Sequence, residues 1–170
     1  MLAALILAAG AATAATAVYV PTCKASSLGA WGGPTQGAAG TLLTEFAFVN
    51  KGASECSLIG YPKLQMLDAA GRPISTTDRH AFQGFDGIER RVVILAPGER
   101  AYFGAAYPDF TGAGQRKCPT AAALVLTAPG ASQPVELRGP TAAITPYAGS
   151  DVKLRCGLVQ MTYVTAKRFQ

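Results

Sequence analysis

Residue types that commonly carry enzymatic chemistry are scarce in this chain. Its 170 residues include one histidine, His80, in the polar run Thr77-Asp78-Arg79-His80-Ala81. A Ser-His-Asp site would have to use His80, and the sequence contains no G-x-S-x-G elbow. Six carboxylates that could act with it follow no regular spacing: Asp68, Asp78, Asp86, Glu89, Asp109 and Asp151. We therefore predict a surface histidine, while a hydrolase using His80 and a carboxylate as acid and base stays open.

Metal and cofactor chemistry has equally little support in the sequence. One histidine plus disulfide-bonded cysteines would leave only carboxylates and methionines as ligands. The chain has neither a phosphate-binding loop nor a dinucleotide fingerprint. We predict no metal site, no cofactor and no enzymatic activity.

The four cysteines are better suited to cross-linking than to catalysis. Cys23, Cys56, Cys118 and Cys156 are widely separated, and no pair has C-x-x-C spacing. In an oxidising compartment an even number suggests two disulfides, and four cysteines allow three connectivities. Cys23 opens the first candidate strand and Cys56 lies just past the second, so these ends meet if the strands pair antiparallel. This predicts Cys23–Cys56 and, by elimination, Cys118–Cys156; four reduced thiols in a cytosolic protein are the alternative.

Basic and aromatic side chains are the candidates for binding. Fifteen Lys and Arg against ten Asp and Glu give a net charge of +5. The residues singled out for contact with a partner are Arg90, Arg91, Arg116, Lys117, Phe82 and Phe85. In an exported chain they favour an anionic envelope polymer or another envelope protein, and not nucleic acid. The alternatives are a solvated basic face and rings that plug loops, as for Trp31 and Tyr107, which also fall in or beside expected loops.

Short strands separated by turns account for most of the chain. Nineteen Gly and eleven Pro suit many turns, and no window beyond the amino terminus has good helical periodicity. We predict strands at Thr41–Asn50, Lys63–Asp68, Val92–Leu95, Arg100–Tyr107, Ala123–Thr127 and Leu158–Val164, with edge pieces at Pro134–Leu137 and Ala142–Ile144. Residues 26–40 are expected to form a loop or weak edge strand, and residues 75–90 stay unplaced. Asp68–Pro73 is expected to form a hairpin turn, and a turn at Pro97-Gly98 is expected to return Arg100–Tyr107 along the preceding strand. The pattern predicts an all-β antiparallel sandwich.

The amino terminus has the features of an export signal. Residues 1–17 form a short Ala-rich apolar run that ends in Ala15-Thr16-Ala17, an A-x-A cleavage pattern. We predict cleavage before Val18, leaving one domain over residues 18–170; a first helix packed in the core is the alternative. Cys23 follows Val20-Pro21-Thr22, which is too bulky for lipidation. The mature protein is therefore expected in the periplasm or outside the cell, without a clear lipid anchor.

Several motifs together resemble a known family. These are Cys23-Lys24-Ala25-Ser26-Ser27-Leu28, then Cys56-Ser57-Leu58-Ile59-Gly60-Tyr61-Pro62, then Leu95-Ala96-Pro97-Gly98, followed by two more cysteines. Their order is similar to that of an uncharacterised domain of bacterial exported proteins and lipoproteins, a domain of unknown function. The resemblance runs from about Cys23 to Val164 and implies export and an immunoglobulin-like β-sandwich. It carries no catalytic residues.

These observations favour an exported, non-enzymatic module that binds within the cell envelope. Gly60, Tyr61 and Pro62 are expected to form a structural corner, in which Tyr61 buries its ring and its hydroxyl bonds a backbone carbonyl. The open alternatives are the hydrolase acting on envelope polymers and an accessory domain of a larger assembly.

Overall fold

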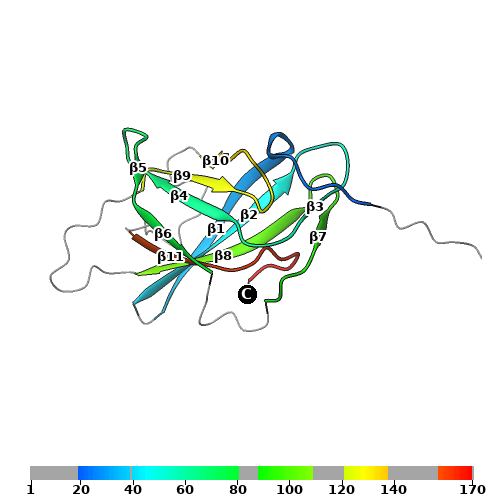
Figure 1. Ribbon diagram of the computed structural model, residues 1–170. Coiled ribbons are helices and arrows are strands. Elements are labelled where there is room, and N and C mark those ends of the chain that lie inside the picture. Colours follow the sequence, from blue (N-terminus) through cyan, green and yellow to red (C-terminus); the bar gives the residue numbers. More distant parts are fainter. Residues whose placement is uncertain (1–18, 39, 81–87, 109–120, 138–156, 170) are drawn as a thin grey trace, which may run out of the picture.

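Strands from distant parts of the sequence build three sheets. The computed structural model describes residues 19–38, 40–80, 88–108, 121–137 and 157–169 (Figure 1). The largest sheet has five strands, in the order β1 (Leu28–Ala38), β2 (Thr41–Asn50), β8 (Arg100–Pro108), β11 (Gly157–Met161) and β6 (Thr76–Arg79). The second has four: β10 (Val135–Leu137), β9 (Ala123–Thr127), β4 (Lys63–Leu67) and β5 (Pro73–Ile74). The described residues are thus all-β, with one 3-10 turn, η1 (Ala25–Ser27), before β1.

A small ribbon completes the structure. β3 (Cys56–Leu58) pairs antiparallel with β7 (Val93–Leu95). Figure 1 shows this ribbon on the side where the described chain begins, away from β5 and β6. It lies beyond the ends of the longer strands.

The hydrophobic core lies between the two larger sheets. β2 is central, between β1 and β8, which agrees with the apolar residues on both of its faces. Phe46 and Phe48 point to the same side and stack on Phe103 of β8, with ring centroids 5.5 and 5.3 Å apart. Leu64, Met66, Leu124 and Leu126 bring the facing strands β4 and β9 into the same core. Burial of these side chains is the main favourable term that holds the sheets together.

Local turns follow the sequence signals closely. Between β4 and β5, the Asp68 carboxylate accepts hydrogen bonds from the backbone N–H of Ala70 (2.9 Å) and Arg72 (2.8 Å). Gly71 adopts φ +75°, a left-handed conformation that favours glycine. The backbone hydrogen bond from Arg72 is the largest cause that lowers the pKa of Asp68. Burial opposes it, and the Arg72 side chain and the Ala70 N–H lower the pKa further. The predicted hairpin turn at this position is confirmed.

Three sequence predictions about strands need correction. Residues 26–40 mostly form the 11-residue edge strand β1 rather than a loop or a weak strand. After the turn at Pro97-Gly98, β8 pairs with β2 instead of returning along β7, so the turn carries the chain from one sheet to another. The pairing of β11 with β6 is parallel, so the fold is not purely antiparallel. In each case a long-range pairing decides the outcome, which local patterns do not specify.

Two aromatic residues expected in or beside loops lie in strands. Tyr107 of β8 is 1% exposed, and its hydroxyl lies 3.2 Å from the Thr44 hydroxyl, which in turn lies 2.7 Å from that of Thr35. These three hydroxyls form a buried row of hydrogen bonds, which satisfies their polar atoms inside the sandwich. Trp31 lies in β1 on the opposite, outer face of the sheet, where its ring meets Tyr102 edge-on at 6.2 Å. Neither ring is a loop plug.

Candidate functional site

The outer surface of the β3–β7 ribbon carries the most exposed large aliphatic side chains in the described part of the chain. Alternation along the two strands buries Cys56, Leu58, Val93 and Leu95 and turns Ser57 and Ile94 outward. Ile94 is 51% exposed, Val92 is 59% exposed and Ile59 is 42% exposed. Ser57 pairs with Ile94 and Leu58 with Val93, so one further step in this register places Ile59 opposite Val92. The three side chains therefore form one exposed apolar cluster, which we call the ribbon patch.

Two predicted binding residues precede the ribbon patch directly. Arg90 and Arg91 are both exposed. Arg91 forms an ion pair with Glu89, whereas Arg90 makes no ion pair within the described residues. The ribbon patch thus combines aliphatic side chains with adjacent positive charge. The other predicted binding residues, Arg116, Lys117, Phe82 and Phe85, lie outside the described residues.

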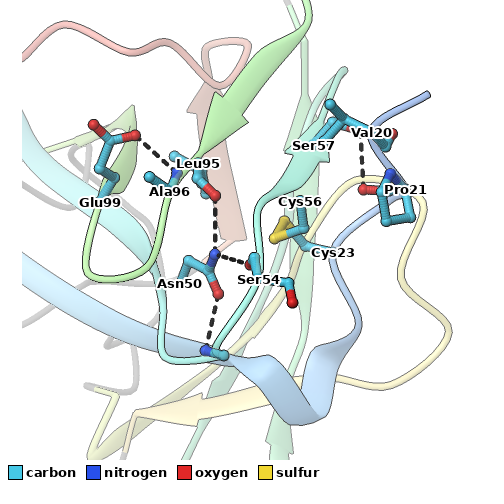
Figure 2. The surroundings of a disulfide bond; sticks show 11 residues. Val20, Pro21, Cys23, Asn50, Ser54, Cys56, Ser57, Leu95, Ala96 and Glu99 are labelled. Carbon is cyan, nitrogen blue, oxygen red and sulfur yellow. Dashed lines mark hydrogen bonds between the residues drawn. A yellow bond between two sulfur atoms is a disulfide. The ribbon is translucent and has the colours of Figure 1, made fainter. Parts of the chain in front are cut away.

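The amino-terminal segment holds the ribbon from one side. Cys23 and Cys56 form a disulfide across a sequence separation of 33, so this predicted bridge is confirmed (Figure 2). The backbone adds two bonds, from Cys23 N–H to the Ser57 carbonyl (3.0 Å) and from Ser57 N–H to the Pro21 carbonyl (2.8 Å). The segment therefore lies beside β3 like a short third strand, and it fixes the ribbon covalently. Cys118 and Cys156 lie outside the described residues.

Asn50, at the end of β2, holds the ribbon from the other side. Its buried side chain donates from Nδ2 to the carbonyls of Ser54 (2.8 Å) and Leu95 (2.9 Å), and its Oδ1 accepts from Gly52 N–H (2.9 Å) (Figure 2). One amide thereby satisfies three backbone groups of the loop before β3 and of β7. This network ties the ribbon to the central strand of the large sheet, so the ribbon patch is presented on a rigid support.

His80 stacks on an aromatic residue that follows Ile59 of the ribbon patch by two positions. It lies at the end of β6, exposed, with its ring 4.1 Å from that of Tyr61 and nearly parallel to it. Tyr163 stacks on the same tyrosine at 3.8 Å. Tyr61 donates its hydroxyl hydrogen to the His80 carbonyl (2.6 Å), as the predicted corner requires. Burial and then the neighbouring Tyr163 raise the pKa of Tyr61 to about 12, so the hydroxyl remains protonated and able to donate.

Asp78 is the carboxylate nearest to His80 along the chain. Its Oδ2 accepts a long hydrogen bond from Leu64 N–H (3.5 Å), while its Oδ1 is buried without a hydrogen-bond partner. Burial raises the pKa of Asp78, and the Leu64 N–H and the charges of His80 and Lys63 oppose this effect. Within the described residues the His80 ring makes no hydrogen bond to a carboxylate or hydroxyl. His80 and Asp78 therefore form no hydrogen-bonded acid–base pair within the described residues.

Comparison with known proteins identifies the family. A model of the family described as a domain of unknown function, DUF4232, matches residues 23–165. The chain belongs to this family. No curated protein and no solved structure matches the chain.

The resemblance inferred from the sequence motifs is therefore confirmed for this DUF4232 domain. The match runs from the first disulfide cysteine to Thr165, whose backbone bridges to Tyr102 of β8. It thus includes all strands from β1 to β11. The family carries no activity that could be transferred to particular residues.

The sequence did not reveal the ribbon patch of this DUF4232 domain. Val92-Val93-Ile94-Leu95 reads as a continuous apolar run, which is typical of a strand buried on both faces. The exposure of Val92 and Ile94 follows from pairing with a strand of three residues, β3, at one end of the molecule. Arg90 and Arg91 were the one available signal, because charges next to such a run indicate a strand near the surface.

Within the described part of this DUF4232 domain, no group of three or more His, Cys, Asp or Glu residues could hold a metal ion. No helix in the same residues is long and apolar enough to cross a membrane.

Proposed function

We propose that this DUF4232 domain is an exported, non-enzymatic, immunoglobulin-like module that binds an anionic component of the cell envelope through the ribbon patch and Arg90. Exposed Ile59, Val92 and Ile94 beside unpaired positive charge are the observation that supports it. Contact with an anionic amphiphilic surface would bury this apolar area and neutralise the charge. The disulfide supports export, because such bonds persist in oxidising compartments.

The anionic partner could be a polymer or a lipid surface, since both present phosphate or carboxylate groups. We would measure binding of the disulfide-bonded protein, without residues 1–17, to soluble polyphosphate and to vesicles of phosphatidylglycerol with phosphatidylcholine. Polyphosphate tests charge alone, whereas vesicles test charge and apolar contact together. We expect binding to anionic vesicles at low salt, weaker binding at high salt and none to neutral vesicles.

Charge-reversal variants test whether the proposed surface is the one that binds. R90E/R91E should weaken vesicle binding by more than about tenfold, because each cation near an anionic surface contributes about 1 kcal/mol. R72E/R79E changes the same number of exposed arginines on β6 and the turn before β5, away from the ribbon, and should bind like the original protein (Figure 1). Equal losses in both variants, or none in either, would contradict the proposed surface.

A third variant separates the apolar contribution. V92S/I94S keeps every charge and should lower vesicle binding while leaving polyphosphate binding unchanged. If it instead abolishes capture of an envelope protein and no variant changes vesicle binding, the accessory-domain alternative replaces the proposal. Unfolding curves of each variant show whether the fold is retained.

A further inference from the structure

The carboxyl-terminal tail, residues 162–169, folds back over the outer face of the large sheet. It continues from β11 along β8, where Thr162 N–H donates to the Gly104 carbonyl (3.1 Å) and Thr165 exchanges two backbone bonds with Tyr102 (2.7 and 2.8 Å). Arg168 then reaches Glu45 of β2, the strand on the far side of β8. The tail therefore crosses the sheet to reach one buried carboxylate.

Glu45 is an unusual residue for the outer face of a strand. It is 4% exposed, although side chains on this face alternate with the core phenylalanines of β2. Both carboxylate oxygens accept hydrogen bonds from the tail. Arg168 donates from Nε to Oε1 (3.0 Å), and the backbone N–H of Phe169 donates to Oε2 (2.7 Å). A buried carboxylate is costly unless charge and hydrogen bonds compensate it, and the tail supplies both.

The strands themselves provide room for this contact. Gly104 of β8 is directly paired with Glu45, so no side chain on that strand covers the carboxylate. On β1 the register shifts between Gly32 and Thr35, and a Cβ on Gly33 would lie 2.5 Å from the Trp31 ring and 3.2 Å from the Glu45 carbonyl. Gly33 thus leaves room for the Trp31 ring on one side of Glu45, and Gly104 places no side chain opposite Glu45 on the other.

Aromatic rings beside Glu45 complete a site for a guanidinium group. Trp31 and Tyr102 flank Ala47, which pairs with both residues and whose small side chain lets the rings approach to 6.2 Å. The Arg168 guanidinium carbon lies 5.5 Å from the Trp31 centroid and 6.0 Å from that of Tyr102. Arg100 also lies over Trp31, at 4.8 Å. Flat guanidinium groups suit such rings better than the compact ammonium of lysine.

We propose that Glu45, Trp31 and Tyr102 form a recognition site for an arginine-bearing peptide, which the chain's own Arg168 occupies and can vacate. Trp31, Glu45 and Tyr102 lie on the paired strands β1, β2 and β8, so strand pairing holds the backbone of all three residues in place. The Arg168 side chain is 55% exposed and Arg168 belongs to no strand, so its side chain can leave without breaking a strand pairing. A second peptide segment that carries Arg and a following backbone N–H then takes its place.

Trp31, the only tryptophan, reports on this site directly. The probe is an acetylated and amidated tripeptide with the sequence of Lys167–Phe169, titrated into full-length R168A while Trp31 fluorescence is followed. We expect a saturable change in R168A and one at least about tenfold weaker in the original protein, whose tail competes at high effective concentration. K167A, with the neighbouring exposed lysine removed, should behave like the original protein.

Changes to the site and to the peptide test the chemistry. R168A/E45Q should lose the response, and its unfolding curve shows whether the fold is intact. A peptide with Lys in place of Arg should bind more weakly, and one with Pro in place of Phe should fail, because proline has no N–H for Oε2. No response in R168A, equal responses in R168A and the original protein, or an unchanged response in R168A/E45Q would overturn the proposal. None of these variants alters the ribbon patch, so its binding is judged separately.

Discussion

The two ends of the described chain are attached to the molecule by different physical means. Each lies beside a strand and pairs with it through the backbone: Pro21 and Cys23 with Ser57, and Thr165 with Tyr102. The amino-terminal segment is then closed by the Cys23–Cys56 disulfide, whereas the tail is closed by the Arg168–Glu45 ion pair. Similar backbone pairing thus supports a permanent attachment at one end and an exchangeable one at the other.

This difference matches the chemistry beside each attachment. The disulfide and the Asn50 network hold a ribbon whose outer side chains are exposed, so these bonds fix the position of the proposed binding surface. The tail covers a carboxylate that would otherwise face water, so movement there would expose a binding site. One region is fixed so that its surface is available, and the other can open so that its site becomes available.

Removing the disulfide should have the largest effect on stability. For C23A/C56A we expect the free energy of unfolding to fall by about 3–4 kcal/mol, because the bond closes a loop of a few tens of residues in the unfolded chain. Urea unfolding of both proteins measures this. A loss below about 1 kcal/mol would mean that backbone pairing and Asn50 hold this end without the covalent bond.

Removing the ion pair at the other end should cost much less. R168A is expected to lower the free energy of unfolding by no more than about 1 kcal/mol, because the arginine is half exposed and water can reach Glu45 once the tail moves. K167A is the matched control and should leave stability nearly unchanged. A loss as large as that of the disulfide variant would show that the tail is as fixed as the amino-terminal segment.

The sequence predicted the features that depend on neighbouring residues. The strand limits at Thr41–Asn50 and Ala123–Thr127 are confirmed, as are the Asp68–Pro73 turn and the Tyr61 hydroxyl bond to a carbonyl. The Cys23–Cys56 bridge followed from the expected antiparallel pairing of two adjacent strands, and β1 and β2 do pair so. Local pattern and short connections were sufficient in these cases.

Features that depend on distant residues could not be predicted in this way. β3, β5 and β6 have only two to four residues each, too few for a periodic signal. No local pattern indicates the contact of Arg168, because its partner Glu45 lies 123 residues earlier. Glu45 itself reads as the polar residue of an alternating strand. Only the assembled sheet shows that the tail buries it.

The smallest expected effect on stability concerns Asp78, which lies at the edge of the large sheet from which the tail starts. It lies on β6, paired with Val159 of β11, the strand that continues into the tail. Burial holds its pKa above the ordinary value in the folded state, so the folded protein binds this proton more tightly than the unfolded chain. The associated stability is present at acid pH and is lost as pH rises through the folded-state pKa.

Replacing this carboxylate with an amide should therefore stabilise the protein at neutral pH. D78N keeps an oxygen for the Leu64 N–H and removes the charge from the buried position, so its unfolding temperature should exceed that of the original protein at pH 7. The difference should shrink toward the ordinary pKa of aspartate, about 4. D68N is the control with opposite sign, because the pKa of Asp68 is lowered: it should be less stable than the original protein at pH 7, by an amount that also shrinks in acid. If D78N were less stable than the original protein at pH 7, the charge of Asp78 would be stabilising the pairing of the edge strand β6 with β11, from which the tail begins.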